Sequence, residues 1–145
     1  MNGHLEAEFP NLRNRDYSVT SPTDPAYNCI AWAASDSLRF WWPVRQNPFV
    51  YWPRGVARDE TLEAFIHAFE TLGFAVCDNT NVEERFEKIA IYANAAGVPK
   101  HAARQLRNGR WTSKLGRDVD IEHTLRALEG VQYGTVVWIM RKSMP

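Results

Sequence analysis

The chain has 145 residues, of which 45% are hydrophobic and 23% charged, enough for one domain with its own core and without metals or disulfide staples. Lysine plus arginine and aspartate plus glutamate number 17 each, so the net charge is zero and no run of basic residues favours nucleic-acid binding. Because no segment supplies about 18 uninterrupted apolar residues for a membrane helix and the N-terminus lacks an apolar signal-peptide run, we expect a soluble cytoplasmic protein, or a toxin exported without a signal.

The first part of the chain predicts one helix between irregular segments. Residues 1–27 scatter prolines, asparagines and charges without a helical or strand period, so we expect them to be irregular. The alanine-rich stretch 29–40 favours a half-buried helix, with Asn28 as its N-cap. Residues 41–55 contain three prolines and five aromatic rings, and they predict an irregular apolar loop.

The remaining chain predicts a helix and then a sheet. In residues 59–73 apolar side chains recur at intervals of three and four, Asp59 can cap the helix and Gly73 can end it. The next apolar runs predict antiparallel strands at residues 74–77, 88–93, 101–106, 110–115 and 135–140. The Asn-Gly pair between the third and fourth runs is typical of a hairpin turn. Residues 120–130 predict a short helix before the last strand.

This order of elements predicts an α+β fold, with N-terminal helices packed on a four- to five-stranded antiparallel sheet. Residues 1–145 would form a single domain, since no linker, repeat or low-complexity tail divides them. Cys29 begins the first predicted helix, which would pack against the sheet.

Cys29 is the candidate nucleophile, because backbone N–H groups and the helix dipole at a helix N-terminus favour a thiolate. His101 opens the predicted strand 101–106 and is the candidate general base and acid. A third group should orient its imidazole. Ser113, across the predicted hairpin, is the first choice, with Asn108 and Gln105 as alternatives.

Several motifs together resemble a family of papain-like cysteine hydrolases related to NlpC-type cell-wall peptidases and amidases. They are an Asn-Cys pair at a helix start, a histidine that opens a strand, a Ser-Lys stretch, a later histidine and a Tyr-Gly pair, here Asn28-Cys29, His101, Ser113-Lys114, His123 and Tyr133-Gly134. The resemblance covers residues 27–134 and implies a papain-like fold, with Cys29 as nucleophile and His101 as base.

The resemblance also implies neighbours of the site. Ser113 and Lys114 would lie near the third catalytic position, and His123 would lie close by. The backbone N–H of Cys29, together with a donor such as Asn28, would form the oxyanion hole that acyl transfer needs.

Each feature also has a purely structural interpretation. A lone cysteine at a helix start is more often a small buried hydrophobe than a nucleophile. His123 stands near the start of a predicted helix, where a partly exposed capping residue is the simpler interpretation. Aromatic residues either wall a substrate cleft or fill the core; those considered for the cleft are Trp32, Trp42, Trp52 and Trp111.

The sequence therefore predicts a cysteine hydrolase of peptide or amide bonds that acts through an acyl-enzyme on Cys29, with transfer to an amine equally compatible. It predicts no cofactor and no metal, because metal-ligand motifs and clustered carboxylates are missing. The expected partner is a peptide or amide substrate, not nucleic acid or a membrane, and the oligomeric state stays open. The alternative is a non-catalytic domain that binds a ligand or protein through its aromatic, proline-rich surface. A bacterial effector or toxin is a third hypothesis.

Overall fold

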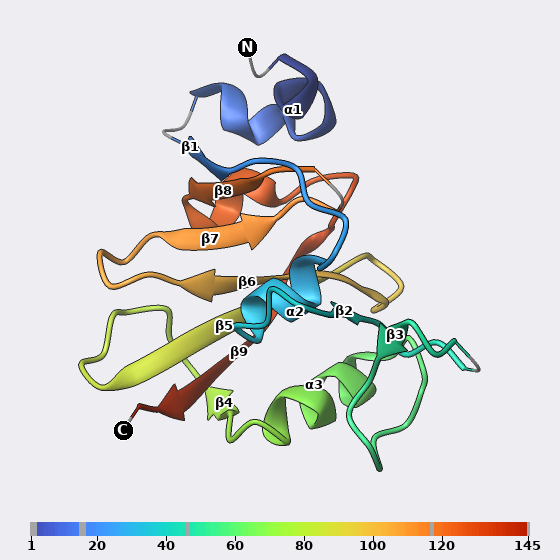
Figure 1. Ribbon diagram of the computed structural model, residues 1–145. Coiled ribbons are helices and arrows are strands. Elements are labelled where there is room, and N and C mark those ends of the chain that lie inside the picture. The colour runs from blue at the N-terminus through green and yellow to red at the C-terminus, as the bar shows by residue number, and fades with distance from the viewer. Residues whose placement is uncertain (1–2, 15–16, 46, 117, 145) are drawn as a thin grey trace.

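The main feature of the fold is one seven-stranded sheet (Figure 1). The computed structural model describes residues 3–14, 17–45, 47–116 and 118–144. The strand order is β1-β8-β7-β6-β5-β9-β4, and every neighbouring pair is antiparallel. The strands are β1 (Ser18–Ser21), β4 (Ala75–Cys77), β5 (Phe86–Ala93), β6 (Pro99–Gln105), β7 (Trp111–Lys114), β8 (Asp120–His123) and β9 (Thr135–Ser143).

The other elements are short. They are the helices α1 (Gly3–Glu8), α2 (Cys29–Ala33) and α3 (Leu62–Glu70), the 3-10 helices η1 (Pro10–Asn14) and η2 (Leu125–Leu128), and a small parallel pair, β2 (Phe40–Trp41) with β3 (Val50–Tyr51). Among the helices of the described residues only α3 is longer than six residues. Figure 1 shows α2 lying across the middle of the sheet, and α2 contacts β6 and β7. None of the helices in the described ranges is both long and apolar enough to cross a membrane.

Apolar side chains cover the sheet on both faces, because successive strand residues point to opposite sides. On the first face, which we call the α2 face, α2 and α3 pack on side chains that include Ile89, Ile91 and Ala102. On the second, which we call the η2 face, α1, η1 and η2 pack on Ala90, Tyr92 and Ala103.

The predicted papain-like α+β arrangement is wrong, because strands build most of the fold. Strands β4, β5, β6, β7 and β9 lie at the predicted apolar runs, whereas β1 and β8 extend the sheet to seven strands. The predicted helix 120–130 is instead β8 followed by η2, since residues 120–123 pair with β1 on one side and with β7 on the other. Residues 1–27, predicted to be irregular, contain α1, η1 and β1.

The two other predicted helices differ in their lengths. The helix predicted over 29–40 ends at Ala33, where Ser35 takes a positive φ of 64° and the Asp36 carboxylate accepts the backbone N–H of Leu38 at 2.8 Å. Such local bonds compete with helix continuation. The helix predicted over 59–73 is present as α3, with Thr61 in place of Asp59 as its cap.

Candidate functional site

Asn28 fixes the position of Cys29 at the start of α2. The Asn28 Oδ1 accepts the backbone N–H of Ala31 at 3.2 Å and that of Trp41 at 3.0 Å, while its Nδ2 donates to the Trp41 carbonyl at 2.7 Å. The side chain is buried, so these bonds join the first turn of α2 to β2 away from water. The resemblance implies a role for Asn28 in an oxyanion hole, whereas in the structure the amide serves the helix cap.

We expect the Asn28→Ala variant to lose about 2 to 3 kcal/mol of unfolding free energy, because it removes a helix cap and two further buried hydrogen bonds. Urea denaturation followed by circular dichroism measures the loss. The matched control is Thr61→Ala, which removes only the cap bond to Ala64 on α3 and should cost about 1 kcal/mol. Equal losses in the two variants would show that the bonds to Trp41 contribute nothing.

The Cys29 thiol is neutral at rest. Burial raises the pKa of Cys29 to about 11, since its residue is only 6% exposed and a thiolate there would lose its hydration. Hydrogen bonds from the backbone N–H groups of Ala102, Ile30 and Cys29 itself, together with the charge of Lys114, act in the opposite direction. The sequence predicts a thiolate, but α2 has five residues and contributes few aligned peptide dipoles.

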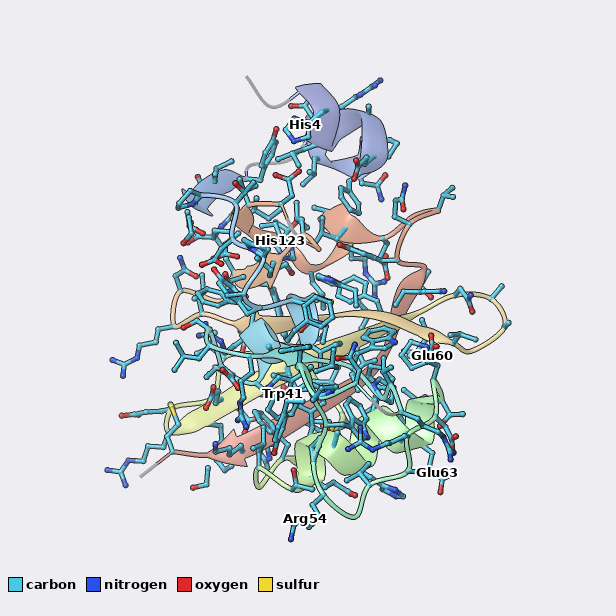
Figure 2. The ribbon with its side chains drawn as sticks, turned by 45° about the vertical axis from the view of Figure 1, so that its right-hand side comes forward. His4, Trp41, Arg54, Glu60, Glu63 and His123 are labelled. Carbon is cyan, nitrogen blue, oxygen red and sulfur yellow. The ribbon has the colours of Figure 1, made fainter. Side chains whose placement is uncertain are left out.

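Three buried side chains form a continuous hydrogen-bonded chain across β6, β7 and β8. The Ser113 Oγ lies 2.9 Å from the His101 Nε2 and 2.7 Å from the His123 Nε2. The His123 Nδ1 lies 2.6 Å from the backbone carbonyl oxygen of Thr124. Figure 2 labels His123 among these strands, between His4 on α1 and Trp41 beside α2. The structure thus brings Ser113 to His101, and it adds His123 to the same chain.

The His101 imidazole is held tightly on the η2 face. The Tyr133 ring stacks on it with centroids 4.0 Å apart and an interplanar angle of 7°, and the Tyr92 ring meets its edge at 5.1 Å. The His101 Nδ1 is buried and has no hydrogen-bond partner in the described part of the chain. Burial, followed by the nearby His123, lowers the pKa of His101 well below 6.5, so the ring is neutral at pH 7.

Stability should fall as the pH drops below about 6.5, because two buried histidines resist protonation. Burial lowers the pKa of His123 from 6.5 to about 4, and that of His101 also lies well below 6.5. Between pH 6.5 and pH 4 the histidines of the unfolded chain bind more protons than those of the folded protein. The free energy of unfolding is therefore full above pH 6.5 and falls as the pH drops toward 4. Urea midpoints across this range measure the effect. The His123→Gln variant should have a shallower slope, and an unchanged slope would contradict the assignment.

The backbone of Ala102, the residue that follows His101 on β6, lies near Cys29, since α2 contacts β6. The Ala102 N–H is among the groups that lower the pKa of the Cys29 thiol. Only Arg104–Thr112 and Gln105–Trp111 are registered between β6 and β7, so the two strands are not paired beside Ala102. Strand alternation directs the Ala102 side chain to the α2 face and the His101 ring to the η2 face. The catalytic pairing of Cys29 with His101 therefore stays a prediction.

The other residues considered for the site make bonds of their own. Lys114 is buried, donates to the backbone carbonyl of Asp118, and lies with its Nζ 5.1 Å from the Tyr27 ring centroid. The alternatives for the third catalytic position point elsewhere, since the Gln105 Nε2 donates to the Thr80 carbonyl at 2.7 Å and Asn108 is exposed.

The four tryptophans considered for a substrate cleft pack into the protein. Trp52 and Trp111 are buried, Trp42 meets the Phe65 ring at 5.4 Å, and the Trp32 Nε1 donates to the Thr112 Oγ1 at 2.9 Å. Two hollows lie away from them and from Cys29. One of about 950 Å³ is lined by residues 82–87, 104–107 and 144, and one of about 320 Å³ is lined by residues 76–78 and 141. Cys29 lines neither of these two hollows.

Some groups at the site carry no strong signal in the sequence. The Ala102 N–H and the Thr124 carbonyl are backbone groups, so the residue types at these positions give no sign of their role. Tyr133, which stacks on His101, appears in the sequence only as part of a Tyr-Gly pair. No group of three or more His, Cys, Asp or Glu residues that could hold a metal ion is present within the described ranges.

The fold and the site define a β-rich domain with a buried thiol at the start of α2 and a histidine-serine-histidine chain on the η2 face of the sheet. The protein belongs to the family described as Domain of unknown function (DUF7689), which matches residues 18–141. All the site residues named above fall within this match. No curated protein and no solved structure matches the chain.

Proposed function

We propose that the protein is a cysteine hydrolase that cleaves an amide or peptide bond through an acyl-enzyme on Cys29, with His101 as general base. The observation that carries the proposal is that only one of the two ring nitrogens of His101 is hydrogen-bonded. Ser113 holds the Nε2 at 2.9 Å, while the Nδ1 is buried and has no partner among the described residues. A histidine that transfers protons needs one nitrogen oriented and the other free.

The reaction begins from a neutral thiol and a neutral imidazole. The His101 Nδ1 must take the thiol proton across the unpaired stretch between β6 and β7 beside Ala102, because the ring and Cys29 lie on opposite faces of the sheet. It takes this proton as the sulfur of Cys29 attacks the substrate carbonyl carbon. The C–N bond then breaks, and the leaving amine takes that proton from the Nδ1, which leaves a thioester on Cys29. Water attacks the thioester and gives a proton to the Nδ1; the C–S bond breaks, and the sulfur takes the proton back as the acid leaves.

Base assistance suits this site better than a preformed thiolate. With its pKa raised to about 11, Cys29 holds its proton at pH 7, whereas the depressed pKa of His101 keeps that ring unprotonated. The N–H groups of Cys29 and Ala102, which act to lower the pKa of the thiol, supply partial positive charge where negative charge develops. Both cysteines are free thiols, and we place the reaction in the cytoplasm, where thiols stay reduced.

The test is to trap the acyl-enzyme. The Cys77→Ser protein, which keeps Cys29 as its single thiol, is incubated with p-nitrophenyl acetate and analysed by intact-mass spectrometry and peptide mapping. We expect one acetyl group on Cys29 that neutral hydroxylamine removes, as it removes a thioester but not an amide. The Cys29→Ala variant should carry none.

The outcome separates two classes of protein. Rapid acetylation of Cys29 in the folded protein, lost in urea, supports the hydrolase. Acetylation no faster than that of the urea-unfolded chain overturns it, because a nucleophilic site must outperform an ordinary thiol. The non-catalytic binding domain would then be the better description.

A further inference from the structure

The backbone carbonyl of Thr124, at the end of the hydrogen-bond chain through His123, determines which atom of each bond is the donor. The Thr124 carbonyl oxygen can only accept, so the His123 Nδ1, 2.6 Å away, carries a proton and donates it. Since the pKa of His123 is about 4, the ring is neutral at pH 7 and holds a single ring proton. The His123 Nε2 is therefore a bare acceptor.

The hydrogen bonds of Ser113 determine which ring nitrogen of His101 carries the proton. Its hydroxyl has one proton, which it donates to the bare His123 Nε2 at 2.7 Å. The Ser113 oxygen must then accept from the His101 Nε2 at 2.9 Å, so that nitrogen carries the proton. A neutral imidazole has one ring proton, and the His101 Nδ1 is left bare. This nitrogen is the buried atom that has no partner among the described residues.

We propose that His123 is a positioning residue that, acting through Ser113, holds the ring proton of His101 on Nε2 and keeps Nδ1 basic. The three side chains come from adjacent strands, so the sheet itself sets their spacing. The inference rests on the proposed function where it makes Nδ1 the base. The position of the proton is independent of any reaction and can be observed alone.

The test is an NMR measurement on protein labelled with ¹⁵N-histidine at pH 7. Two-bond ¹H–¹⁵N correlations tell which ring nitrogen bears the proton, and the His101→Gln variant assigns the signals of residue 101. We expect Nε2–H for His101 and Nδ1–H for His123 in the wild type. In His123→Leu the Ser113 hydroxyl loses its acceptor and turns to the His101 Nε2, so the His101 proton should move to Nδ1.

The matched control is His123→Gln, whose side-chain carbonyl again offers Ser113 an acceptor and should retain the Nε2–H form. A purely structural role for His123 would not move the proton in one variant and keep it in the other. A wild-type His101 protonated on Nδ1, or a His123→Leu protein that keeps the Nε2–H form, overturns the inference. If His123→Leu does not fold, the position of the His101 ring proton in the wild type and in His123→Gln still tests the inference.

Acylation provides a separate readout. His123→Leu should acetylate Cys29 at least about tenfold more slowly than His123→Gln, because a protonated Nδ1 cannot act as the base. Equal acylation rates alongside a moved proton overturn the role of the tautomer in the reaction. A tautomer that responds as expected in a protein that forms no acyl-enzyme supports the positioning by His123 and overturns only the proposed function.

Discussion

Acylation of Cys29 is expected to slow by about 100- to 10,000-fold when His101 is replaced with glutamine, the usual range for loss of a general base. Glutamine fills much of the same space and can still donate to Ser113, but its amide cannot take up a proton at neutral pH. The measurement is the rate of acetyl transfer from p-nitrophenyl acetate to Cys29 in the Cys77→Ser background. Lys100→Gln, at the exposed residue just before His101 on β6, is the matched control and should leave the rate unchanged.

The pH dependence of this rate distinguishes a lost base from a disturbed fold. In the parent protein the rate should stay level as the pH falls through 6.5, because the pKa of His101 lies well below that value. In His101→Gln only the thiolate can react, so the rate should rise about tenfold per pH unit up to the pKa of Cys29 near 11. Parallel profiles for the two proteins would contradict the role of His101.

The Gly134→Ala variant is expected to lose about 4 kcal/mol of unfolding free energy. Gly134 has a φ of +77°, and a Cβ atom there would lie 2.0 Å from the backbone oxygen of Ala93. Neither the strained dihedral nor a contact with backbone atoms can be relieved by moving a flexible side chain. Urea denaturation measures the loss. Because Gly134 follows Tyr133, the variant should also disturb the ring stacked on His101.

Gly97→Ala is the matched control for this substitution. Gly97 has a φ of +81°, and a Cβ atom there would meet no atom of the described residues within 4 Å beyond its chain neighbours. Alanine at this position therefore experiences only the backbone strain and should cost about 1 kcal/mol. The difference between the two variants isolates the contact with Ala93. A loss at Gly134 no larger than that at Gly97 would show that the loop around Gly134 shifts easily.

Local patterns predict much of the central sheet but not its edges or the shortness of its helices. Strands β5, β6 and β9 contain apolar runs that a sequence window detects. Strand β1 has mostly exposed residues, and it is held by its pairing with β8, about a hundred residues away in the chain. The end of α2 depends on Ser35 and Asp36, whose turn geometry overrides the helix propensity of the neighbouring alanines.

The sequence predicts that two of the site residues lie close together, but it does not predict the hydrogen bond to the third residue that completes the chain. The Asn-Gly turn predicts that Ser113 lies across a hairpin from His101, and the two side chains meet with their polar atoms 2.9 Å apart. The link to His123 depends on β8, which the sequence suggests as a helix. Burial also changes the chemistry: the helix-start position predicts a thiolate at Cys29, but desolvation is the largest influence on its pKa and raises it.

The covering of the η2 face has a consequence for how the protein is divided into functional pieces. The family match begins at residue 18, yet Leu5, Phe9 and Leu12 are buried against the same face that holds His101, Ser113 and His123. The Phe9 ring lies 4.9 Å from that of Tyr133, which also stacks on His101. Trimming the chain to the matched residues would open an apolar surface and let water reach the histidines. The folded domain therefore includes residues that lie before residue 18, where the family match begins.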